Sequence, residues 1–170
     1  IFTDLTRLEV DATFDLATGK FSVTDINTGK KATMNAESGG KPWGAPIPEG
    51  KYDILDHPDL DYFRLEPKDV PYGDDTYNSH NRNQFRLHKS GNTVGCIAAK
   101  DYTLWKTVRD LIRKTNTTTT NVDSKSFYPW ADDKERIKKF GKIEVIRTTI
   151  LSRAIGRIKE RANDRAKLEA

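Results

Sequence analysis

The sequence is poor in the residues that build disulfides and metal sites. It contains one cysteine, Cys96, and three histidines, His57, His80 and His88, among 170 residues. A single cysteine excludes a disulfide within the chain, and no CxxC or HExxH spacing can be assembled from these residues. We therefore expect no metal and no other cofactor. The Cys96 thiol is then core filler, a handle for a partner, or a nucleophile.

Long apolar runs are also missing. No stretch of about 18 apolar residues occurs, and no charged-then-apolar leader opens the chain, so we expect neither a transmembrane segment nor an export signal. The 29 Lys and Arg against 25 Asp and Glu give a net charge of +4, but many cations lie between Lys134 and Lys167. We expect no nucleic-acid binding, because that needs a basic stripe interleaved with stacking aromatic side chains.

Short alternating segments separated by turn residues fill the first 100 residues. Leu5–Ser38 alternates between apolar and polar residues around two Gly-containing turns, which predicts a β-meander. Gly39–Gly50 is dense in Gly and Pro and is expected to be an ordered loop. A polar surface loop is expected over Lys68–Asn83. Further strands are predicted at Lys51–Leu55, Tyr62–Glu66, Gln84–Lys89 and Gly95–Ala99.

Helical periodicity marks the second half of the chain. Asp101 is expected to cap a helix over Tyr102–Arg113, in which Leu104, Val108, Leu111 and Ile112 recur at helical spacing. We also predict a strand at Thr117–Asp123, a short helix at Asp132–Phe140, a strand at Lys142–Ile146, and a basic, partly exposed C-terminal helix with a stripe of Ile150, Leu151, Ala154, Ile155 and Ile158. The fold class is α+β, mainly β, with a domain over 1–147 and a helical extension over 148–170.

The segment from Gln84 to Asp101 carries the chemistry. His88 stands on a predicted strand, eight residues before Cys96, and we expect two antiparallel strands to bring imidazole and thiol face to face. A neighbouring imidazole activates a thiol by lowering its pKa from about 8.5. Gly95 lets a substrate approach the backbone, and the N–H groups of Gly95 and Cys96 are candidates for an oxyanion hole. Acyl transfer is the implied reaction class.

Supporting residues are expected around this pair. Arg86 is two positions before His88, shares its strand face, and is a candidate for a substrate carboxylate. Tyr77, Ser79 and His80 lie in the polar loop and could line the cleft, and Trp43 could wall it. A solvated arginine, a plain surface loop and a packed tryptophan are the corresponding structural alternatives.

Three ordered segments resemble the L,D-transpeptidases. They are Ser38-Gly39, then Gly44-Ala45-Pro46-Ile47-Pro48-Glu49-Gly50-Lys51-Tyr52, then His88 with Thr93-Val94-Gly95-Cys96-Ile97, within a stretch from Leu5 to Ile146. The chain is most similar to a subgroup found among peptidoglycan-targeting effectors of type VI secretion. The chain departs from the usual transpeptidase pattern at Lys89, Val94 and Ala98. These departures fit the effector subgroup better. Ser38, Gly39 and Thr93 are expected to contact substrate because they belong to the matched segments.

The resemblance implies a β-sandwich with one packed helix and an L,D-carboxypeptidase or D-amino-acid exchange activity. The expected bond is the one between the third residue and the terminal D-Ala of a peptidoglycan stem tetrapeptide, cleaved through an acyl-enzyme on Cys96. The implied setting is a secreted antibacterial effector in the periplasm of a target cell, with an immunity protein and a secretion-apparatus carrier as candidate partners. Two alternatives stay open: a non-catalytic cell-wall binding module, and a cysteine peptidase or amidase that acts on other wall bonds.

Overall fold

The computed structural model describes residues 9–39, 44–91, 95–124 and 134–169. The described elements confirm a mixed α+β chain made mainly of strands. In chain order they are β1 (Val10–Asp15), β2 (Lys20–Asp25), β3 (Lys31–Glu37), β4 (Gly50–Leu55), β5 (Tyr62–Pro67), β6 (Thr76–Tyr77), the short 3-10 helix η1 (Asn78–His80), β7 (Arg82–Asn83), β8 (Arg86–His88), β9 (Ile97–Ala99), α1 (Tyr102–Lys114), β10 (Thr118–Asp123), β11 (Lys134–Ile146) and α2 (Ile150–Glu169).

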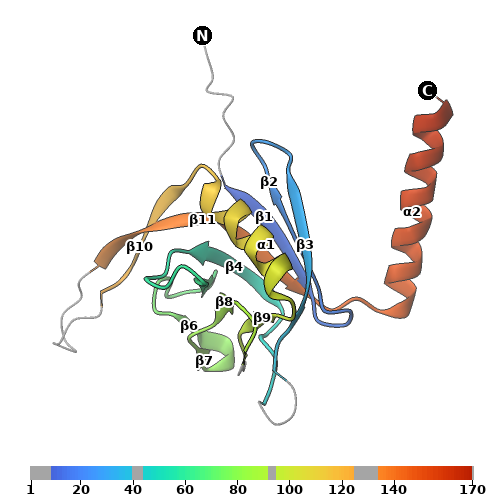
Figure 1. Ribbon diagram of the computed structural model, residues 1–170. Coiled ribbons are helices and arrows are strands. Elements are labelled where there is room, and N and C mark those ends of the chain that lie inside the picture. The colour runs from blue at the N-terminus through green and yellow to red at the C-terminus, as the bar shows by residue number, and fades with distance from the viewer. Residues whose placement is uncertain (1–8, 40–43, 92–94, 125–133, 170) are drawn as a thin grey trace.

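The main sheet closes on itself. Its strand order is β1-β2-β3-β9-β8-β5-β4-β11-β10, and β1 also pairs in parallel with β11, which leaves β10 appended to a barrel-like ring (Figure 1). The closure point is Val10 opposite Gly141, where a side chain at Gly141 would collide with the Val10 backbone. Closure pairs the edge of β1 that an open sheet of this order would expose, while β10 stays at the end of the strand order.

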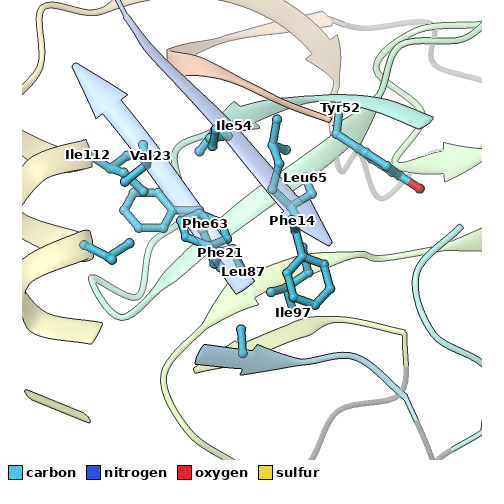
Figure 2. Packing of buried hydrophobic residues seen from close by; sticks show 14 of the residues in the cluster. Phe14, Phe21, Val23, Tyr52, Ile54, Phe63, Leu65, Leu87, Ile97 and Ile112 are labelled. Atoms are coloured by element: carbon cyan, nitrogen blue, oxygen red, sulfur yellow. The ribbon is translucent and has the colours of Figure 1, made fainter. Parts of the chain in front are cut away.

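The interior of the ring holds the core. Phe14, Phe21, Phe63, Leu87 and Ile97 are at most 1% exposed and come from five different strands (Figure 2). Because side chains alternate along a strand, the neighbours of these residues face away from the core. This alternation decides which residues of β5, β8 and β9 form the candidate site.

Helix α1 packs on β2, β3 and β9. Asp101 caps it as predicted, its carboxylate accepting the Thr103 and Leu104 N–H groups at 2.7 and 3.2 Å. In the first turn of α1, the buried residue differs from the expected one. Leu104 is 40% exposed and Trp105 is fully buried, with its indole N–H donating to Asp61 at 3.1 Å.

The predicted helix at Asp132–Phe140 is wrong over Lys134–Phe140, because β11 runs unbroken from Lys134 to Ile146. The segment pairs in antiparallel register with β10, from Asp123 opposite Lys134 to Thr118 opposite Lys139. Pairing with the Thr-rich strand overrides the helical preference of the Lys- and Glu-rich segment.

The C-terminal helix is present as α2 and stands away from the closed sheet (Figure 1). Ile150, Leu151 and Ile158 are 80%, 71% and 64% exposed, so the predicted apolar stripe faces solvent. The link to the barrel is made just before the helix, where the Thr148 hydroxyl donates to Asp15 at 2.6 Å. No helix in the described part of the chain is long and apolar enough to cross a membrane.

Candidate functional site

His88 is the last residue of β8, and Cys96 directly precedes the neighbouring strand β9 of the closed sheet. β8 and β9 run parallel, with Leu87 opposite Ile97 and His88 opposite Ala98, so the expected antiparallel pair is wrong. The other edge of β9 pairs antiparallel with β3, which fixes its direction. Leu87 and Ile97 point into the core, so His88 lies on the opposite face, and the same alternation carried one residue back from β9 assigns Cys96 to that face too. The parallel register, carried back two residues from Ala98, places Cys96 level with Arg86, two positions before His88 on β8.

The His88 ring is held in one tautomer. Its Nδ1 lies 2.6 Å from the carbonyl oxygen of Lys89, and a carbonyl can only accept, so Nδ1 carries the hydrogen and Nε2 the lone pair. The ring also stacks on Tyr62, with centroids 5.0 Å apart. Burial lowers the pKa of His88, which keeps the imidazole neutral at neutral pH.

The Cys96 thiol is half-buried beside β8. Its sulfur donates to the Gln84 carbonyl at 3.7 Å. Burial raises the pKa of Cys96, and the Arg86 N–H and guanidinium oppose that rise without cancelling it. No hydrogen bond joins Cys96 to His88, both of which the structure describes. Without substrate, the site therefore holds a neutral Cys96 thiol and a neutral His88 imidazole.

A charged network flanks the thiol. Arg86 donates to both carboxylate oxygens of Asp75, at 2.8 and 2.6 Å, and Arg64 lies 3.6 Å from the same carboxylate. Arg64 also pairs with Glu66, which is fully buried. Burial raises the pKa of Glu66 to about 6, although Arg64 opposes the rise. The Arg86 guanidinium, expected to meet a substrate carboxylate, is thus already bound to a carboxylate of the chain.

The Gly/Pro loop is fastened by residues expected to contact substrate. The Ser38 hydroxyl accepts the Ile47 N–H at 2.8 Å. Gly39 has a φ of +65°, and a Cβ there would lie 2.5 Å from the Pro46 nitrogen. The Tyr77 hydroxyl donates to the Glu49 carbonyl at 3.3 Å. Each of these residues has a visible structural role in positioning the loop.

The remaining predicted residues divide between exposed and undescribed positions. Ser79 and His80 are exposed on η1, where the Ser79 hydroxyl lies 2.9 Å from His80 Nδ1. The His80 ring packs edge-on against Tyr77, with centroids 4.4 Å apart. Trp43 and Thr93 lie outside the described residues.

Sequence reasoning missed Arg82. Its guanidinium donates to the carbonyls of Ala45 and Pro46 at 2.9 and 2.6 Å, and so joins the Gly/Pro loop to the cysteine segment. Gly95 has a φ of +79°, and a Cβ there would lie 2.5 Å from Arg82 Nη2. The sequence marked Gly95 as a point of close approach but did not say that an arginine makes the approach.

Asp75 was also missed, because it is one of several acidic residues in a segment expected to be a plain polar loop. Within the part of the chain that the structure describes, no three His, Cys, Asp or Glu side chains come together as a metal site. Comparison with protein-family models, curated proteins and solved structures found no match to this chain. The resemblance to L,D-transpeptidases therefore rests on the residues of the chain itself.

Proposed function

We propose that this chain is a peptidoglycan-directed cysteine enzyme, an L,D-carboxypeptidase or D-amino-acid exchange enzyme that works through an acyl-enzyme on Cys96. The observation that carries the proposal is the register of β8 and β9. Cys96 comes two positions before Ala98, the residue opposite His88, and alternation from Leu87 and Ile97 assigns both side chains to the face away from the core. A thiol beside an imidazole with an oriented, unprotonated Nε2 is the arrangement that nucleophilic acyl transfer requires.

The chemistry follows from the two neutral groups. Cys96 Sγ attacks the carbonyl carbon of the third stem residue while His88 Nε2 takes the thiol proton. The C–N bond to the terminal D-Ala breaks, and the imidazolium returns that proton to the leaving amine. Water then hydrolyses the thioester, or the amine of a free D-amino acid attacks it and forms a new amide bond. The Lys89 carbonyl keeps Nε2 as the proton acceptor in both halves of the cycle.

The finer parts of the proposal rest on the resemblance alone. They are the L,D-transpeptidase sandwich as the specific form of the closed sheet, action in the periplasm of a target bacterium, and an immunity protein and a secretion carrier as partners. The mixed, strand-rich architecture is compatible with them.

A non-catalytic wall-binding module is the second candidate. Two observations favour it: the pKa of Cys96 is raised, and its sulfur donates to the Gln84 carbonyl instead of to His88. In such a module the thiol would only fill space. A nucleophilic thiol would be alkylated in the folded protein at a rate that depends on His88, whereas a filler thiol would react only on unfolding.

The deciding experiment is mass spectrometry of muropeptides incubated with the wild type, Cys96→Ala and His88→Gln. We expect the wild type to remove the terminal D-Ala from tetrapeptides and to exchange it for added D-Met. Both variants should be inactive while keeping the wild-type circular dichroism spectrum. Full activity of Cys96→Ala would remove the thiol from the mechanism, and cleavage at another bond would favour an amidase or another peptidase.

A further inference from the structure

Four cations lie on β5, β7 and β8 or directly after β8, and three of them pair with carboxylates. Arg64 pairs with Glu66 and Asp75, Arg86 pairs with Asp75, and Lys89 lies 3.8 Å from Asp61. The fourth cation is Arg82, which has no carboxylate partner among the residues that the structure describes. Of the four, it is therefore the cation that no described carboxylate already pairs, which leaves it open to an anionic ligand.

The Arg82 guanidinium has donors to spare. Two of its five N–H groups are used by the carbonyls of Ala45 and Pro46, and these bonds fix the plane of the group. The same group lies 5.3 Å from the centre of the Phe85 ring. An arginine held in one orientation, with unused N–H groups, is prepared to bind a carboxylate with little further loss of side-chain freedom.

Its position matches the geometry of the substrate. In a stem peptide that ends in D-Ala, the terminal carboxylate is two bonds from the scissile nitrogen. A cation that recognises it must therefore lie within about one residue of the nucleophile. Arg82 Nη2 packs against Gly95, the residue before Cys96, so closely that a Cβ at Gly95 would lie 2.5 Å away.

We propose that Arg82 binds the free terminal carboxylate of the stem peptide and restricts the enzyme to peptides that carry one. This inference rests on the proposed function and adds to it a specificity-determining residue. It also gives Arg86 a different part from the one expected, because the bidentate bond to Asp75 leaves the carboxylate of the substrate to Arg82.

The test compares a stem tetrapeptide ending in D-Ala with the same peptide ending in D-alaninamide. We expect the wild type to prefer the free acid by roughly 10- to 100-fold in kcat/KM, the range of a charge-assisted hydrogen bond. Arg82→Gln keeps hydrogen-bond donors for the loop carbonyls but removes the charge. It should bring the ratio close to 1 by losing activity on the acid only. Arg82→Lys should keep part of the preference, and Arg157→Gln, on exposed α2, is the matched loss of one distant charge.

Each outcome separates the two proposals. If Arg82→Gln lowers kcat/KM equally for both peptides, Arg82 is only a support for the Gly/Pro loop and the inference is wrong. A wild-type ratio near 1 overturns it without any variant, even if Arg82→Gln does not fold, and leaves the proposed function standing. If the wild type cleaves neither peptide, the proposed function fails and the inference fails with it.

Discussion

Asp75→Asn tests whether the charged network tunes the thiol. The change keeps the size of the side chain but removes the negative charge that holds Arg86 in a bidentate pair and attracts Arg64. The Asp75 and Arg86 side chains are 17% and 15% exposed, so the pair is mostly shielded from water. Breaking a buried pair costs about 3–5 kcal/mol, and partial exposure reduces that cost to roughly 2–3 kcal/mol.

The same substitution destabilises the fold, but it should make the Cys96 thiol easier to ionise. Burial is the main cause of the raised pKa of Cys96, but the charge of Asp75 adds to it and the charge of Arg86 opposes it. Removing the Asp75 charge leaves Arg86 uncompensated, so the pKa of Cys96 should fall. We therefore expect a protein that is less stable but whose thiol ionises at lower pH.

Two measurements check the pair of effects. Urea unfolding gives the free energy of unfolding, and the rate of iodoacetamide alkylation against pH gives the thiol midpoint separately from its accessibility. Asp74→Asn is the matched control, because Asp74 lies in the same loop and accepts hydrogen bonds from Thr76 and Asn78, not from an arginine. An unfolding free energy within about 0.5 kcal/mol of the wild type, or a midpoint that rises, would refute the reasoning.

Two further predictions concern the pH dependence of Cys96 and His88 and the deletion of helix α2. Because burial raises the pKa of Cys96 and lowers that of His88, alkylation should keep rising above pH 8.5, while kcat/KM should fall only below the ordinary histidine range near pH 6.5. A maximal alkylation rate at pH 7 would instead indicate a thiolate–imidazolium pair. Deleting residues 150–170 keeps the Thr148–Asp15 bond and should leave cleavage of soluble muropeptides nearly unchanged. A truncated protein that folds but does not cleave them would place α2 in the active unit.

Local sequence signals predicted elements whose stability is local or whose pattern is strict. The Asp101 cap, the strands of the meander and the helix of the tail needed only short-range residue preferences and periodicity. The direction of β9 could not be read in the same way. A short polar connection after His88 suggested a hairpin, but pairing with β3 decides the direction, and β3 is about 60 residues away in the chain.

The two residues proposed to react could be singled out from the sequence, but the charged pairs around them could not. Cys96 and His88 follow from residue type and spacing, and the face they share follows from alternation around Leu87 and Ile97 whichever way β9 runs. No such rule predicts which carboxylate or carbonyl each arginine binds, because that depends on which loop folds over the sheet.

Arg82 and Arg86 illustrate this limit. On sequence alone, Arg86 was the better candidate for a substrate carboxylate, since it shares a strand face with His88. The structure pairs it with Asp75 from the preceding loop and brings Arg82 onto Gly95. The glycine before the cysteine has two roles here, a φ of +79° and room for a guanidinium, and only the first can be anticipated from a Gly-Cys pair. The arginine next to Gly95 that no described carboxylate pairs is therefore Arg82, which sequence reasoning had left in the polar loop.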